Sequence, residues 1–302
     1  ARAFGTNNLP DCSNMCHEPS GVAVSEQIGS GKGSVTLDDF ERAEAIFVFG
    51  QNPGTNHPRM LGELRRAAKR GCRIVVFNPL RERGLERFTD PQSPAEMLGG
   101  GSTAIATHYF QPRIGGDLAV VTGIAKVVVE GGDDVLDRAF IDANTIGYDA
   151  FADEVRATAW DDIERESGLS RVQIEQAAAV YLGSRATIAC WGMGLTQHRR
   201  SVATIQALVA LLLLRGNIGK PGAGPCPVRG HSNVQGDRTM GIHEKPAASS
   251  VSHRRARMAS TPWTRSRRCT TDAARCSSRW AATSPQRRRT QRSPMPRCAT
   301  AR

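Results

Sequence analysis

The stretch AIFVFGQNPGTNHP, residues 45–58, decides how this chain folds. Its first part, residues 45–49, is an unbroken apolar run rich in aromatic and β-branched side chains, which predicts a buried strand. Gly50 follows directly, and a polar loop then leads to His57, where a helix is expected to begin. A strand that enters such a loop ahead of a helix is typical of sheets that bind phosphate or nucleotides.

The residues that follow complete one crossover unit of a parallel sheet. Residues 57–70 carry apolar side chains at helical spacing, and Gly71 stands where a left-handed helix end is expected. Residues 73–77 form the next strand. A strand, loop, helix and strand within about 33 residues predict a parallel crossover, and ligands bind at the ends of its strands.

A second strand, loop and helix lie further along the chain. The apolar run 186–191 enters a Gly-Met-Gly loop at 192–194, and an apolar helix is expected at 201–214. The sequence therefore predicts an α/β fold of serial dinucleotide-binding-type parallel sheet units with helices on both faces. Between the two units we expect, in chain order, a long loop at 81–116 and helices at 118–129, 135–140 and 170–182.

The basic charge of the chain is confined to its last part. The formal net charge is +11, but residues 246–302 contain 14 Arg, no Lys and one acid, and the remaining 26 basic and 28 acidic residues sum to −2. This tail also lacks Leu, Ile and Phe, so we expect it to be disordered. Its composition favours a frameshifted reading of GC-rich DNA over a solvated tail or an RNA-binding arm. We divide the chain into a partial domain at 1–44, an α/β region at 45–245 and the tail at 246–302.

Targeting and redox features are few. The chain has no run of 18 apolar residues and no signal peptide, so no membrane span is expected. Outside the tail, Cys12 and Cys16 are the only two cysteines close in sequence, so disulfides are not expected and a reducing cytoplasm is the predicted location. The first residues read as an internal segment, and we expect the chain to be a piece of a longer protein.

The segment Cys12-x-x-x-Cys16-His17 is a candidate metal or redox site. Its three-residue spacing differs from that of attached haem and of most zinc sites, and no second cysteine pair completes a four-thiolate site. Taken alone, the segment is either such a site or an ordinary thiol in a loop. The polar residues around it, including Asn14 and Ser20, favour a loop that meets a ligand with its backbone.

Polar segments also follow the predicted strands. Residues 50–58 suit phosphate or a polar base, because small residues let the backbone approach and Asn and Thr add hydrogen bonds. Asn78 stands directly after the second strand, where an acid commonly contacts ribose hydroxyls. Residues 225–237 place Arg229, a residue suited to binding anions, among polar side chains with no helix or strand period, which predicts a functional loop.

Five segments, taken together and in order, resemble the formate dehydrogenase alpha-subunit-like molybdopterin oxidoreductases. Their common order is more specific than any one segment, and the resemblance covers residues 1 to about 245. A further run, QPRIGGD at 111–117, resembles the cytoplasmic, single-subunit-like branch. The five segments are CSNMCHEPS (12–20), GQNP (50–53), WGMGLTQ (191–197), GNIGKPG (216–222) and RGHSNVQG (229–236).

The resemblance implies a role for each matched residue. Cys16 would be the protein ligand of a molybdenum or tungsten ion held by two molybdopterin guanine dinucleotides, and a soft thiolate suits such a site. His17 would accept or relay the proton released from substrate, and Arg229 would hold a small anionic substrate such as formate. The positions that match or neighbour cofactor contacts are Gly50, Asn52, Thr55, Asn56, Asn78, Met193, Gly194, Gln197, Gly230 and His231.

The implied reaction is a two-electron oxidation of formate or another small substrate. Its electrons would pass to a 4Fe-4S cluster, which the family carries upstream of residue 1, and so the polypeptide alone is expected to be inactive. Glu18 and His231 depart from the Gly and Gln usual in the family, which puts formate itself in question. The sequence does not indicate the electron acceptor.

Two other classes of function compete with this interpretation. A basic nucleic-acid-binding protein with an α/β scaffold is the alternative, but only the tail supports it, and we expect no nucleic-acid partner. A nicotinamide-dependent dehydrogenase is disfavoured, because no G-x-G-x-x-G motif follows either predicted strand.

Overall fold

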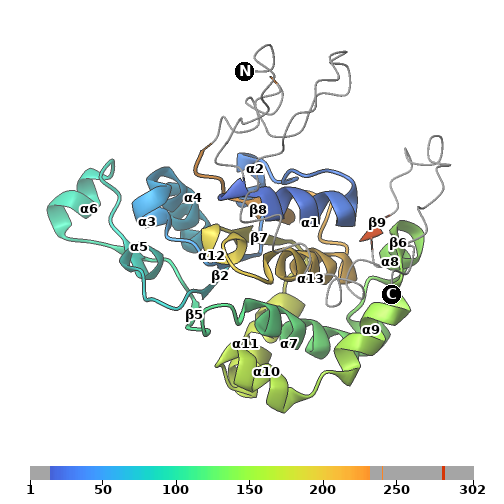
Figure 1. Cartoon of the computed structure of the whole chain (residues 1–302). Helices are drawn as coiled ribbons and strands as arrows, with labels where there is room; N and C mark the ends of the chain where they lie inside the picture. The colour runs from blue at the N-terminus through green and yellow to red at the C-terminus, as the bar shows by residue number, and fades with distance from the viewer. Residues whose placement is uncertain (1–13, 232–239, 241–280, 283–302) are drawn as a thin grey trace, which may run out of the picture.

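A sheet of five parallel strands lies at the centre of the molecule (Figure 1). The computed structural model describes residues 14–231, 240 and 281–282. The two predicted strand, loop and helix units join this one sheet, because its first strand pairs with strands from both units. The α/β fold predicted from the sequence is confirmed. The strands, in their order across the sheet, are β5 (His108–Phe110), β2 (Arg73–Phe77), β1 (Ala45–Phe49), β7 (Thr187–Trp191) and β8 (Gly224–Pro227).

Alternating side chains of the central strands enter two separate cores. On β1, Phe47 and Phe49 face one core, and Ile46 and Val48 face the other. Phe49 stacks on Phe77 of β2 with 4.6 Å between ring centroids. Because both faces of β1 are buried, this strand is apolar throughout, as parallel strands covered by helices usually are.

Helices cover both faces of the sheet, as predicted. The first face carries the larger core, shared by α1 (Glu18–Ile28), α7 (Asp117–Glu130) and α13 (Ser201–Leu214). The apolar α13 is buried almost all round, which explains why it lacks a polar face. The second face is covered by α4 (Pro58–Lys69), which buries Leu61, Leu64 and Ala67 on one side only. Within the described part of the chain, no helix has the length and apolar character needed to cross a membrane.

Three predictions of local structure were wrong. The polar residues after Cys16, including Ser20, were interpreted as part of a loop, yet residues 18–28 form α1, which packs along α13 and buries small side chains such as Ala23. The long loop at 81–116 contains short elements and the sheet strand β5. Residues 225–237 show no strand periodicity and were predicted to be a loop, but residues 224–227 form β8. Prolines are tolerated there because β8 is an edge strand.

The remaining predicted helices are close to the observed ones. The helix at 170–182 is α11 (Arg171–Leu182), capped by Ser170. The helix expected at 135–140 instead begins at Arg138, because the Asp137 side chain accepts a hydrogen bond from the Phe140 N–H and caps it. The other elements are α2 (Leu37–Phe40), α3 (Pro53–Asn56), α5 (Arg83–Glu86), α6 (Pro94–Gly99), α8 (Arg138–Asn144), α9 (Tyr148–Ala157), α10 (Trp160–Ser167), α12 (Met193–Thr196), a 3-10 turn (Gly132–Asp134), β3 (Arg87–Phe88), β4 (Thr103–Ala104), β6 (Thr145–Ile146) and β9 (Ala281–Ala282).

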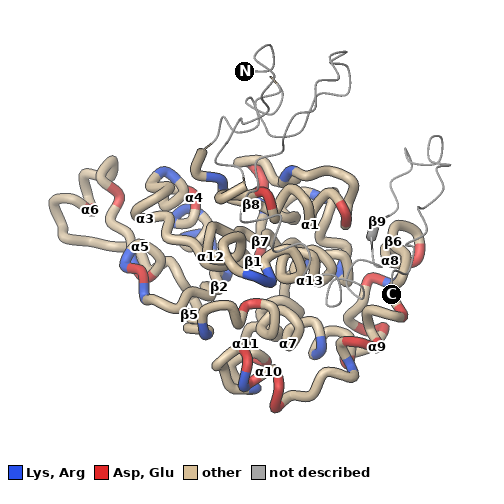
Figure 2. Tube along the Cα trace, viewed as in Figure 1, with Lys and Arg blue, Asp and Glu red and all other residues tan. Residues whose placement is uncertain are grey.

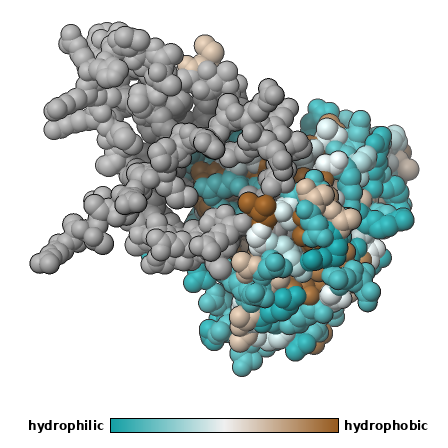
Figure 3. All heavy atoms as spheres, turned by 90° about the vertical axis from the view of Figure 1, so that its right-hand side faces the viewer, coloured by the Kyte–Doolittle hydropathy of each residue, from teal (hydrophilic) through white to brown (hydrophobic). Residues whose placement is uncertain are grey.

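In the view of Figure 2, Lys and Arg are interspersed with Asp and Glu along the described residues. The uncovered surface in Figure 3 is mainly hydrophilic, with small scattered apolar patches. Ala281–Ala282 pair with Thr145–Ile146, and the rest of the predicted tail at 246–302 lies outside the described residues, as does Cys12.

Candidate functional site

The chain changes direction across the sheet between β1 and β7. From β1 it adds β2 and β5 on one side, and it then adds β7 and β8 on the other. Open parallel sheets bind ligands at such a switch point, outside the carboxyl ends of the strands. Gly50 comes directly after β1, and residues 192–194 come directly after the neighbouring strand β7. The two loops predicted from the sequence therefore meet at this point.

Two glycines bring these loops into direct backbone contact. The Gly194 N–H donates to the Gly50 carbonyl oxygen at 3.0 Å. A Cβ atom placed on Gly194 would lie 2.5 Å from the Gly50 Cα, and one on Gly50 would lie 2.7 Å from the Gly194 Cα. Gly50 also has a φ of +53°, a conformation that favours glycine. Larger residues would force the two loops apart.

A cavity of about 490 Å³ opens above this contact. Its volume lies in the range of sites that hold one small ligand or cofactor. Backbone and polar groups from the ends of four strands meet there. The described residues that line it are Cys16, Gly50, Gln51, Asn52, Asn56, His57, Asn78, Glu82, Gly192, Met193, Gly194, Val228, Gly230 and His231.

Cys16 is the only cysteine among the described residues that line this cavity. It stands two residues before α1 and is 6% exposed. Among the described residues, no three His, Cys, Asp or Glu side chains come together in a way that could hold a metal ion. A metal bound at Cys16 would therefore need most of its ligands from a cofactor.

His17 is turned away from the cavity into the protein. Its Nε2 lies 3.0 Å from the Val228 carbonyl oxygen, which can only accept, so Nε2 carries the proton. Its Nδ1 lies 2.9 Å from the Ser20 Oγ, and that oxygen accepts from Trp191 Nε1 at 2.9 Å. The Ser20 hydroxyl therefore donates to Nδ1. Burial, together with the nearby Arg229 guanidinium, lowers the pKa of His17 to about 4, so the ring is neutral at pH 7.

Arg229 faces a neighbouring groove. Its guanidinium donates to the Gly31 carbonyl oxygen at 2.8 Å, and its side chain lines a groove of about 970 Å³ beside α4. His57 and Val228 line both the groove and the cavity, so the two spaces adjoin. His57 Nε2 donates to the Arg229 carbonyl oxygen at 3.0 Å, which holds the Arg229 backbone beside the cavity. The backbone of residues 228–231 thus reaches the Cys16 cavity, whereas the Arg229 guanidinium lies next to it.

Asn52 is engaged inside the protein through both ends of its amide. Its Oδ1 accepts from the Thr55 N–H at 3.2 Å and caps α3. Its Nδ2 donates to the Glu82 carboxylate at 2.7 Å. Asn52 therefore positions Glu82, a cavity residue that the sequence interpretation did not single out.

Gln51 is a second cavity residue that the sequence interpretation missed. Its side chain is 5% exposed, and its Oε1 has no hydrogen-bond partner among the described residues. Its Nε2 makes a long contact of 3.4 Å with His57 Nδ1. A buried acceptor without a partner is costly, so this oxygen is suited to a donor group on a bound molecule. The Gln51 oxygen, the close contact of Gly50 with Gly194 and the Cys16 thiol together suit a cofactor that carries polar donors and a metal.

The structure brings most of the predicted site residues together. Four of them do not line the cavity: His17 and Arg229, described above, and Thr55 and Gln197. Thr55 is exposed, and Gln197 donates to the Met15 carbonyl oxygen at 2.7 Å beside the Cys16 loop. The sequence interpretation missed Gln51, His57 and Gly192. They lie in segments that follow predicted strands, and this position at a strand end could have identified them as cavity residues. The nine that line it are Cys16, Gly50, Asn52, Asn56, Asn78, Met193, Gly194, Gly230 and His231.

Comparisons with known proteins point to one family. The model of the molybdopterin oxidoreductase family matches residues 1–264, and so runs past residue 245 into the predicted tail. The chain is 51% identical over 270 residues to protein YdeP of Escherichia coli strain K12, covering 87% of this chain and 36% of that protein. It is 32% identical over 242 residues to formate dehydrogenase H of the same strain, covering 80% and 31%.

A solved structure shares the fold. Acetylene hydratase from Pelobacter acetylenicus matches with a TM-score of 0.58 and 20% identity, over 74% of this chain and 27% of that one. The chain spans about a third of the length of the curated relatives it matches. The family match covers most of the chain, and the site lies at the switch point of the shared fold. This chain belongs to the molybdopterin oxidoreductase family.

Proposed function

We propose that this chain is the part of an oxidoreductase that binds molybdopterin guanine dinucleotide and supplies the thiolate ligand of its metal. The observation that carries the proposal is Cys16, a buried thiol in the cavity at the sheet's switch point, with too few other metal-binding groups among the described residues to hold a metal without a cofactor. Two dinucleotides with molybdenum or tungsten would supply the other, sulfur-rich ligands. The 490 Å³ cavity suits one of the two, and the other would bind elsewhere.

Each residue of the site has a distinct task in this proposal. The bound metal centre would supply the two-electron redox chemistry. Gly50 and Gly194 let the backbone approach the cofactor, and Gln51 offers it a buried acceptor. Arg229 would bind a small anionic substrate at the border between groove and cavity. This requires its guanidinium to leave Gly31.

His17 is proposed to relay the proton that leaves the substrate. In this structure its Nε2 holds a proton against the Val228 carbonyl oxygen, and its Nδ1 accepts from Ser20. A second proton could reach Nδ1 only if the Ser20 hydroxyl turned to accept from the ring. The Trp191 contact would remain possible during that turn, because a hydroxyl oxygen has two acceptor sites.

The substrate and the path of the electrons are the finer parts of the proposal. Similarity to formate dehydrogenase H supports formate or another small anion as the substrate of the whole protein. Glu18 and His231 argue for a substrate other than formate, since they replace residues usual in formate dehydrogenases. Electrons would pass to a 4Fe-4S cluster outside this chain, and we propose a cytoplasmic location.

Cofactor content and metal ligation test the proposal directly. The chain is purified from a host that makes the dinucleotide cofactor, and metal is measured by mass spectrometry and guanine nucleotide by acid release of GMP. We expect both in the wild type. In Cys16→Ser we expect the GMP content to be kept and one metal–sulfur ligand to be lost from the X-ray absorption spectrum.

Cys72→Ser is the matched control, because Cys72 is also buried but lies in the core on the α4 face. Burial raises the pKa of the Cys72 thiol to about 11, so it remains protonated and unsuited to binding metal. This variant should match the wild type in both measurements. Absence of GMP and metal from the wild type, or an unchanged absorption spectrum in Cys16→Ser, would contradict the proposal.

A further inference from the structure

Glu82 is the only carboxylate among the described residues that line the Cys16 cavity. It lies in the short segment between β2 and α5, five residues beyond the end of β2. Its Oε2 accepts the Asn52 amide at 2.7 Å, and no described residue bonds to its Oε1. One oxygen of the carboxylate is therefore held by the protein, while the other is left for a ligand.

The segment that carries Glu82 is anchored by residues at the end of β5. The Tyr109 hydroxyl donates to the Leu80 carbonyl oxygen at 2.7 Å and accepts from the Glu82 N–H at 2.9 Å. The Gln111 amide donates to the Pro79 carbonyl oxygen at 2.9 Å. These bonds hold the backbone on both sides of position 81. Glu82 is thus positioned before any ligand arrives, which reduces the entropic cost of binding.

The chemistry of a carboxylate restricts what it can bind in a nucleotide site. An ionised carboxylate only accepts hydrogen bonds and repels phosphate, so it must face a part of the nucleotide that carries donors. In parallel sheets with this crossover, an acid after the second strand commonly binds the ribose hydroxyls. Asn78 occupies the first position after β2, where such an acid commonly stands, and it carries no charge. Glu82 is the acid that reaches the same cavity.

We infer that Glu82 binds the ribose hydroxyls of the guanosine part of the cofactor. The inference rests on the proposed function and names the residue that takes over the role expected at position 78. It also orients the nucleotide, since the diphosphate must point away from Glu82. Asn52 acts on this contact indirectly, because its amide fixes the rotamer of the carboxylate.

Nucleotide binding to the cofactor-free chain tests the inference without an activity assay. The full chain is produced in a host that cannot make the cofactor, and its affinities for GDP and for 2′,3′-dideoxy-GDP are measured by calorimetry. The wild type should bind GDP about tenfold more tightly, the size expected for a charge-assisted hydrogen bond. In Glu82→Gln and Glu82→Ala this preference should fall to about twofold or less.

Glu86→Gln is the matched control. Glu86 lies four residues further on in α5, pairs with Arg81 and does not line the cavity. It should keep the wild-type preference for GDP. Circular dichroism and thermal unfolding show whether each variant is folded, and Glu82→Gln keeps the size of the native side chain.

The outcomes separate the two claims. A wild type that binds GDP, with the same preference over dideoxy-GDP in both Glu82 variants, overturns the role of Glu82 and leaves the proposed function standing. A folded wild type that binds neither nucleotide overturns the proposed function and the inference together.

Discussion

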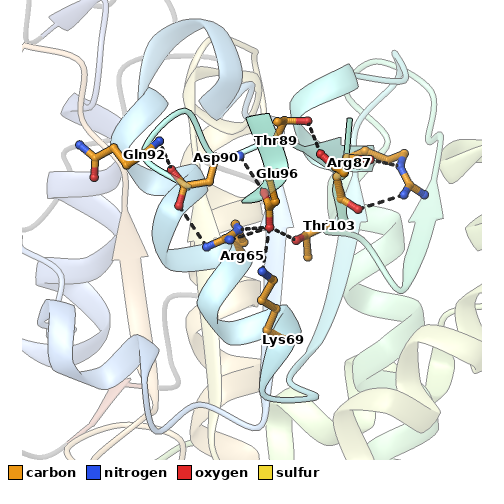
Figure 4. Close-up of polar contacts among 10 residues, drawn as sticks. Arg65, Lys69, Arg87, Thr89, Asp90, Gln92, Glu96 and Thr103 are labelled. Atoms are coloured by element: carbon orange, nitrogen blue, oxygen red, sulfur yellow. Dashed lines mark hydrogen bonds and ion pairs between the residues drawn. The ribbon is translucent and has the colours of Figure 1, made fainter. Parts of the chain in front are cut away.

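Two regions of this protein differ in how completely their buried or partly buried polar side chains are hydrogen-bonded. In the Glu96 cluster, formed by Arg65, Lys69, Asp90, Glu96 and Thr103, the Glu96 carboxylate is saturated (Figure 4). Its Oε1 accepts from Arg65, Lys69 and Thr103, and its Oε2 accepts from the Asp90 N–H. In the cavity, Gln51 Oε1 has no partner among the described residues and Glu82 uses one oxygen.

The difference distinguishes polar side chains that stabilise the fold from polar side chains that are available to a ligand. The Glu96 cluster ties α6 and β4 to α4, and its charges satisfy one another without a ligand. The cavity keeps acceptors free at the switch point of the sheet, at a cost to the stability of the empty protein. Removing a polar side chain should therefore lower the stability of the cofactor-free chain where that side chain is fully paired, and raise it where a buried acceptor has no partner among the described residues.

The largest effect on stability is expected from Gly194→Ala, which disrupts the contact between Gly50 and Gly194 beneath the cavity. The new Cβ would lie 2.5 Å from the Gly50 Cα and 2.8 Å from its carbonyl oxygen, and neither backbone can yield easily. We expect the free energy of unfolding to fall by roughly 2–4 kcal/mol. Urea unfolding measures this change. Gly21→Ala in α1 is the control, because nothing lies within 4 Å of its new Cβ, and stability there should rise by about 0.5–1 kcal/mol.

A smaller effect, of opposite sign, is expected from Gln51→Leu. It removes a buried oxygen that has no partner among the described residues, so the cofactor-free chain should be stabilised by up to about 1 kcal/mol, while its GMP content after expression with cofactor should fall. Gln206→Leu is the matched comparison. Gln206 is also buried, but it donates to Glu26 at 2.7 Å, so the same change should destabilise the chain by about 1–3 kcal/mol. Equal losses of stability in the two variants would contradict the distinction between a paired and an unpaired buried amide.

The smallest effect is expected in the Glu96 cluster and depends on pH. Hydrogen bonds from Arg65, the Asp90 N–H and Lys69 lower the pKa of Glu96 to about 2. Because the folded pKa lies below the unfolded one, the stabilisation is present above about pH 4.5 and is lost as the pH falls towards 2. In Glu96→Gln this part of the acid sensitivity should disappear.

Urea midpoints measured between pH 2 and pH 6 check this expectation. Glu63→Gln on the same helix, α4, removes one carboxylate outside the Glu96 cluster and is the control. If Glu96→Gln loses stability with acid as steeply as the wild type, the saturated carboxylate is not what stabilises this region at neutral pH.

Much of the sheet could be predicted from local sequence. The strands β1 and β2 and the helix α13 were expected at the observed residues, because a strand or helix that is buried on both faces in an α/β fold is mostly apolar. The site followed from the same reasoning, since Gly50, Asn78 and Gly194 come after strands whose carboxyl ends share one edge. The short strand β5 and the proline-containing β8 carry no such local signal and form only by pairing with a neighbour already in place.

The residue types of the site were determined by the sequence alone: a thiol at 16, glycines at 50 and 194, and an arginine at 229. Only the tertiary structure decided where these groups point. It turns the His17 ring onto Ser20 and Val228, directs the Arg229 guanidinium into the neighbouring groove, and brings Glu82 to Asn52 across 30 residues. Local periodicity reports whether a side chain is buried, whereas its direction depends on hydrogen-bond partners that are distant in the sequence and meet only once the sheet has formed.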